Sequence, residues 1–125
     1  MKKISIKHFN FSTNTWLRGL EFYRVELRFL EERLGEIAGD NTGKVVAVEI
    51  EYFQNQVIIH REQLDLLKHR IHELEGQLEQ ELAESPFVSE QAAHAAASLA
   101  KDYATEEKLM AEMRHAFNRF AAEWM

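Results

Sequence analysis

Residues 44–83, KVVAVEIEYFQNQVIIHREQLDLLKHRIHELEGQLEQELA, decide the fold of this chain. Apolar side chains recur there at alternating steps of three and four residues, which is the period of one face of an α-helix. The members of this face are Ile50, Phe53, Val57, Leu64, Leu67, Ile71, Leu74 and Leu78, and the polar His60 occupies one position of the same face. We therefore expect one helix of about 40 residues, roughly 60 Å long. Such a length is typical of a coiled-coil-like bundle.

Two further helices are expected on either side of this segment. The same spacing of apolar residues predicts a helix over residues 16–38, and the glycines and asparagine of residues 39–43 (GDNTG) end it. Ser85 and Pro86 predict the start of a third helix over residues 86–123, because they suit the N-cap and the first helical position. Short connections make neighbouring helices antiparallel. We predict an all-α, antiparallel up-down-up three-helix array with one long central helix, in a single domain over residues 16–125.

The first fifteen residues give a different pattern. Ile4 and Ile6 alternate with polar residues, and Phe9 and Phe11 repeat the alternation in the other phase. Alternation of this kind is typical of extended chain. Residues 12–15 (STNT) are all good helix N-caps. The sequence therefore predicts an extended, basic and aromatic N-terminal arm over residues 1–15.

The central helix carries a second apolar stripe in its first half. Its members are seven residues apart, and the stripe stops where Glu73 takes the next place: Val45, Tyr52, Ile59 and Leu66. A helix over residues 16–38 is long enough to cover only that half, so we expect it to contact this stripe. The other half would then be a thin hairpin, since residues 92–100 are rich in alanine.

A thin hairpin is marginal alone, and this suggests a partner. Phe22 and Phe29 lie on an outer stripe of the first helix, and aromatic side chains at that spacing need cover. We expect a homodimer that completes the bundle, with Phe22, Phe29, Phe9 and Phe11 as the candidate dimer surface.

Composition limits the classes of function. The chain has 125 residues, 46% of them hydrophobic, which is enough for one domain with a modest core. The absence of cysteine excludes thiolate catalysis and cysteine-ligated metals. A net charge of −6 argues against nucleic-acid binding. With no apolar run of membrane-spanning length, we expect a cytoplasmic protein without membrane contact.

Patterns for catalysis or metal binding are weak. One Glu-x-x-His spacing, Glu112 to His115, faces away from the apolar stripe, whereas di-metal bundles need several such groups facing inward. Asp65, His69 and His72 share a face of the central helix, but it is the solvent face. No nucleophile with a base and no phosphate loop is present. We expect no metal and no cofactor.

Two polar residues interrupt the apolar stripes within well-formed helix: His60 on the central helix and Glu106 on the third. Distances along the helices place them within about one turn of each other, with the Tyr23 hydroxyl close by. The candidate polar cluster is His60, Tyr23, Glu106, Gln56 and Gln63. It could be a satisfied buried network that sets helix register, a pH-sensitive contact, or a ligand or metal pocket.

The function expected from these patterns is that of a non-enzymatic helical interaction or scaffold module that self-associates, with other protein partners possible. The alternative is a bundle protein with a polar interior ligand or metal pocket around His60, Tyr23 and Glu106.

Overall fold

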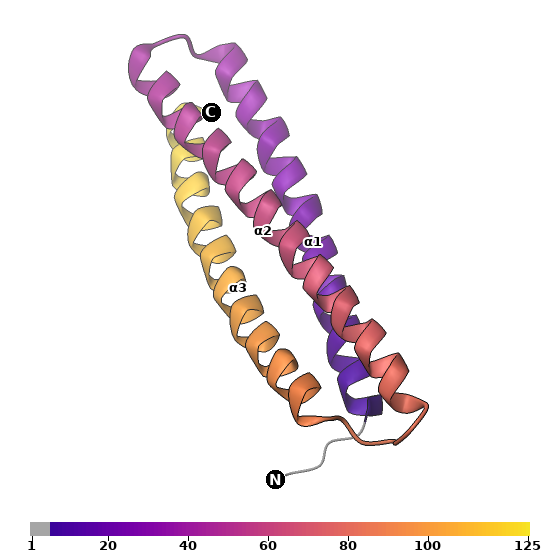
Figure 1. The fold of residues 1–125 in the computed structure, drawn as a ribbon. Helices are drawn as coiled ribbons and strands as arrows, with labels where there is room; N and C mark the ends of the chain where they lie inside the picture. The colour runs from indigo at the N-terminus through magenta and orange to yellow at the C-terminus, as the bar shows by residue number, and fades with distance from the viewer. Residues whose placement is uncertain (1–5) are drawn as a thin grey trace.

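Three long helices make up the fold. The computed structural model describes residues 6–125, which form α1 (Ile6–Asp40), α2 (Lys44–Leu82) and α3 (Glu90–Trp124). The helices run antiparallel, with the start of α1 at the same end as the α2–α3 connection and the C-terminus near the α1–α2 turn (Figure 1). The predicted all-α, antiparallel three-helix arrangement is confirmed. Dimerisation stays a prediction.

The core is built around one side of α2. Its buried residues follow the predicted stripe with one addition at the start: Val46, Ile50, Phe53, Val57, His60, Leu64, Leu67, Ile71, Leu74 and Leu78. We call this set the core stripe. Both α1 and α3 pack against α2, while α1 and α3 make fewer contacts with each other. Phe53 shows the packing directly, since its ring meets Phe117 and Phe120 of α3 at centroid distances of 5.4 and 5.1 Å.

The extended arm predicted over residues 1–15 is wrong from residue 6 onward; residues 1–5 lie outside the described part of the chain. Helix α1 already begins at Ile6. Phe9 is only 8% exposed and Thr13 is buried, and both follow helical spacing towards Leu20. The Thr13 hydroxyl donates to the carbonyl of Asn10, so it lies along the helix instead of capping a new one. Burial of Phe9 decides the local structure here.

A longer α1 also corrects the prediction of a thin two-helix hairpin. With 35 residues, α1 is roughly 52 Å long, close to the roughly 58 Å of α2. Its first turns reach the alanine-rich start of α3, and one groove is lined by both helices: His8, Phe9, Ser12, Trp16, Ala93, Ala96, Ala97 and Ala100. Small alanine side chains allow this close approach, so α1 covers the end of the bundle that was expected to be bare.

Helix α3 begins later than predicted. Its N-cap is Ser89, whose side chain accepts from the backbone N–H of Ala92, whereas Pro86 lies in the connection. The Glu81 carboxylate accepts from both the backbone N–H and the hydroxyl of Ser89, at 2.8 Å each. These bonds lower the pKa of Glu81, with the backbone bond as the main cause. They fix the α2–α3 connection to the end of α2.

The corrected start of α1 predicts different effects for two neighbouring phenylalanines. Phe9→Ala removes a buried ring and should lower the free energy of unfolding by roughly 2–4 kcal/mol. Phe11→Ala, the matched control, removes an exposed ring and should change it by no more than about 0.5 kcal/mol. Urea unfolding followed by circular dichroism measures both. Equal, small effects would mean that residues 6–15 do not pack on the core.

Candidate functional site

A buried contact between a histidine and a glutamate lies at the centre of the bundle. His60 Nδ1 of α2 and Glu106 Oε2 of α3 are 2.9 Å apart, and their side chains are 6% and 3% exposed. Apart from Thr13, they are the only polar residues in the core formed by residues 7–125. The two residues that interrupt the predicted apolar stripes therefore meet each other.

This contact satisfies the groups that the core buries. An ionised carboxylate can only accept hydrogen bonds, so in that state the proton lies on His60 Nδ1. Within residues 7–125, no buried side-chain nitrogen or oxygen lacks a hydrogen-bond partner. A buried polar pair of this kind gives little net stability against an apolar pair, but losing one partner is costly. The arrangement is that of a closed structural pair.

Tyr23, predicted to join the cluster, lies elsewhere. Its hydroxyl donates to Glu107 Oε2 at 3.0 Å, on the α1–α3 side of the bundle. Glu106 and Glu107 are consecutive, so the helix turns them about 100° apart: one reaches α2 and the other reaches α1. Burial, followed by the hydrogen bond to Glu107, raises the pKa of Tyr23 to about 12. The predicted five-residue cluster is therefore divided between two helix interfaces.

The two glutamines of the predicted cluster stay near His60 on α2. Both Gln56 and Gln63 are partly buried. Gln56 lines a groove between α2 and α3 together with His60 and Met113. Neither makes a bond to the buried pair, so they border it without completing it.

The interface between α1 and α3 is polar. Arg114 of α3 donates two hydrogen bonds to the Glu26 carboxylate of α1, at 2.8 and 2.7 Å. These bonds raise the pKa of Arg114. Tyr103 lies directly against Gly19 of α1, where an added Cβ would overlap its hydroxyl. Glycine at residue 19 therefore leaves room for the Tyr103 hydroxyl, and a larger residue there would require the Tyr103 side chain to move.

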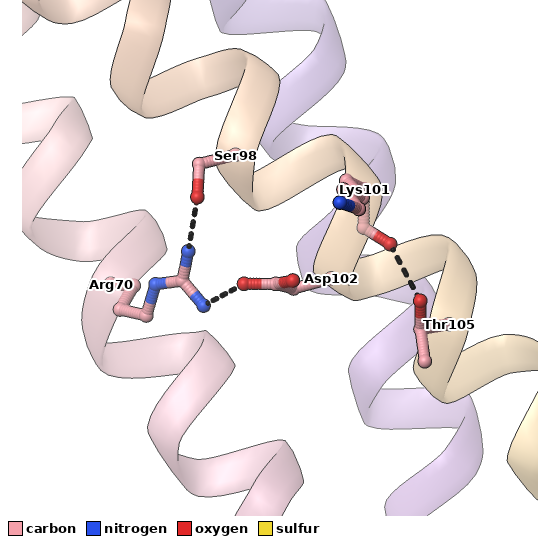
Figure 2. A network of polar contacts seen from close by, with 5 residues as sticks. All are labelled: Arg70, Ser98, Lys101, Asp102 and Thr105. Carbon is pink, nitrogen blue, oxygen red and sulfur yellow. Dashed lines mark hydrogen bonds and ion pairs between the residues drawn. The ribbon is translucent and has the colours of Figure 1, made fainter.

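A polar network also joins α2 to α3 beyond the buried pair. Figure 2 shows Arg70 of α2 reaching Asp102 and Ser98 of α3, at 2.8 and 3.3 Å. Thr105, on the next turn, donates to the carbonyl of Lys101 within its own helix. Because Arg70 already has two partners on α3, its role is to attach the helices to each other.

Two surface histidines of α2 each contact a glutamate three or four residues further along the same helix. On the predicted solvent face of α2, His69 contacts Glu73 at 2.7 Å and His72 contacts Glu75 at 2.8 Å. Asp65 instead accepts from Arg24 of α1 at 2.8 Å. Over the described part of the chain, no three histidine, aspartate or glutamate side chains are grouped to coordinate one metal ion.

The second apolar stripe of α2 is uncovered. The prediction that the first helix contacts it is wrong: its members and Val48 are between 51% and 68% exposed. We call this set the α2 face: Val45, Val48, Tyr52, Ile59 and Leu66. It continues onto α3 through Leu109, which lines the same groove as Tyr52 and Ile59. Heptad spacing revealed the stripe, but a single-helix pattern gave no signal for Leu109.

The predicted phenylalanine surface is only partly exposed. Phe9 belongs to the core, while Phe11, Phe22 and Phe29 are between 60% and 68% exposed. We call these three the α1 face. Phe22 contacts the ring of Tyr23 edge-on, with centroids 5.7 Å apart. The chain thus presents two apolar surfaces, one on α2 and one on α1.

Comparison of the chain with models of known protein families, with curated proteins and with solved structures gives no match. Within the described residues, every helix is too polar or too short in its apolar runs to cross a membrane.

The buried pair predicts a strong coupling between two substitutions. His60→Leu or Glu106→Leu alone leaves a polar group buried without its partner and should cost roughly 3–5 kcal/mol. The double variant removes both groups. Its free energy of unfolding should lie within about 1 kcal/mol of the wild-type value, or above it. Urea unfolding of all four proteins gives the coupling energy. Additive effects would show that the two side chains act independently.

The position of Tyr23 predicts a pH effect. Its folded-state pKa of about 12 lies above the ordinary value near 10. The protonated phenol therefore stabilises the fold below pH ~10, and this contribution is lost as the pH rises towards 12. Glu107→Gln should bring the ionisation of Tyr23 to lower pH, measured by tyrosinate absorbance against a Tyr23→Phe reference. An unchanged titration would contradict the Tyr23–Glu107 contact.

Proposed function

We propose that this protein is a non-enzymatic helical interaction or scaffold module that self-associates. The observation that carries the proposal is the α2 face, an apolar stripe on the central helix that neither α1 nor α3 covers. It begins in the first turn of α2 and ends before Glu73, so it has a defined length and limits.

The number and exposure of the apolar side chains in the α2 face support a binding role. Monomeric proteins rarely expose contiguous apolar patches of more than a few hundred Å². The α2 face has five large side chains, each more than half exposed, and Leu109 extends it. The groove between Tyr52, Ile59 and Leu109 also reaches Met113 of the core. Apolar side chains from a partner would fit such a groove, because they would bury the exposed stripe and contact the core at once.

The remaining polar contacts fit a structural module. His60 and Glu106 satisfy each other, and Arg70 and Arg114 each join two helices. Each of these side chains bonds to a residue of another helix, which is what a structural role in helix packing requires.

The alternative is a bundle protein that takes a ligand near His60. One observation favours it: the groove beside the buried pair has a volume of about 340 Å³ and is lined by polar as well as apolar residues, including Gln56, His60 and Glu112. That volume lies within the range of small-molecule sites. Tyr23 would not take part, since it lies on the α1–α3 side. A small molecule that binds the wild type but not the folded double variant His60→Leu/Glu106→Leu would favour this alternative over self-association.

Self-association through the α2 face predicts a dimer that one substitution dissociates. Light scattering after size-exclusion chromatography should give about twice the chain mass of 14.6 kDa. Leu66→Glu places a charge within the α2 face and should give a monomer. Leu82→Glu is the matched control, since Leu82 is equally exposed on the same helix but lies outside the face. A monomeric wild-type protein at all accessible concentrations would refute the proposed function.

A further inference from the structure

Resting on the proposed self-association, we infer that the α2 face binds the α2 face of a second copy in antiparallel orientation, about a twofold axis that passes beside Asn55. The partner is a second copy of this chain. Two neighbouring features of α2 suggest this pairing: the uncovered apolar stripe in the first half of the helix and the acidic residues in its second half.

The stripe is symmetric about its own middle. Its outermost members, Val45 and Leu66, lie equally far from the point between residues 55 and 56, and so do Tyr52 and Ile59. A twofold axis through that point puts Val45 of one copy opposite Leu66 of the other and Tyr52 opposite Ile59. A twofold interface needs a surface that is complementary to itself, and the four residues of the heptad stripe meet that need. Val48, the fifth member of the α2 face, then lies opposite Gln63 of the other copy.

The charge of the chain selects the antiparallel orientation. From residue 71 to residue 100 there is no lysine or arginine, and the acids are Glu73, Glu75, Glu79, Glu81, Glu84 and Glu90. A parallel pair would bring the two acidic halves of α2 side by side, within the screening length of about 8–10 Å. An antiparallel pair sends them to opposite ends of the dimer. Repulsion between like charges therefore disfavours the parallel pair.

Asn55 lies at the centre of the stripe, where an apolar residue would otherwise be expected. In the antiparallel pair its amide meets the amide of the other Asn55. Each amide can both donate and accept, so the two can satisfy each other across the axis. An asparagine within a helix interface favours the register in which it is paired, because a shifted pair would leave it unsatisfied. Glu62, seven residues further on, is a second polar residue at the border of the stripe.

The buried area fits a weak, reversible dimer. Residues 45–66 form a strip roughly 33 Å long and about 10 Å wide, so pairing two strips covers roughly 700 Å² in total. That area is below that of stable, specific interfaces and is typical of weak, transient ones. The dimer should therefore dissociate on dilution. The α1 face offers a smaller apolar surface, since it has three exposed large side chains where the α2 face has five.

Cysteine cross-linking tests the orientation, because the chain has no cysteine of its own. The test uses the full chain with single exposed substitutions, under mild oxidation, followed by non-reducing electrophoresis and mass spectrometry. Asn55→Cys should cross-link with itself for the most part. Val45→Cys alone and Leu66→Cys alone should each form few disulfide-linked dimers. A mixture of the two variants should form them efficiently. Phe22→Cys, on the α1 face, is the control and should not cross-link.

The outcomes separate this inference from the proposed function. Efficient cross-linking of Val45→Cys with itself would mean a parallel pair and would overturn the inference. Cross-linking of Phe22→Cys in place of Asn55→Cys would move the interface to the α1 face; the inference would fall while self-association stands. A wild-type monomer in light scattering would refute both. Light scattering of the reduced variants shows whether each still dimerises before oxidation.

Discussion

The core stripe of α2 is the constraint on which the rest of the structure depends. One helix face, with residues at steps of three and four from Val46 to Leu78, packs against both α1 and α3. Because both neighbours share that one side, they lie at its two margins, and ion pairs and hydrogen bonds such as Arg24–Asp65 and Arg70–Asp102 border them there. The α2 face lies beyond the α3 margin of this side, where Tyr52 and Ile59 line a groove with Leu109 and no further helix of the described chain follows. The same arrangement that builds the core thus leaves the α2 face uncovered.

His60 and Glu106 show what that shared core stripe requires. Each would destabilise the bundle as a lone buried polar group, yet together they form a satisfied contact between α2 and α3. Such a pair forms only when the two helices have the right axial position, so it distinguishes the native register from a slipped one. Two leucines would pack in several registers with similar free energies. We therefore expect the pair to select the native register in an interface that is otherwise made of apolar residues.

Much of this fold could be predicted from the sequence, because heptad spacing reports burial on a helix directly. It gave α2 nearly to the residue, and it put His60 and Glu106 close together. The start of α1 could not be predicted, because alternating residues and STNT resemble an arm with a cap, while burial of Phe9 by distant residues of α3 decides the outcome. Tyr23 was misplaced because spacing along α3 does not tell whether residue 106 or residue 107 turns towards α1. The same limit hid the exposure of the α2 face: two apolar stripes on one helix predict two neighbours, but the spacing does not tell which segment, if any, of the chain covers the second stripe.

The acidic half of α2 gives this uncovered stripe its limits. An apolar helix face without such limits could slide along a partner or bind many helices of similar kind. Here the stripe stops at Glu73, so a pair that slides by a heptad in that direction would place acids against apolar side chains and leave part of the stripe exposed. Parallel pairing would add repulsion along the whole acidic half. Charge in one half of the helix and apolar side chains in the other therefore act together, and the pairing that satisfies both is the antiparallel one.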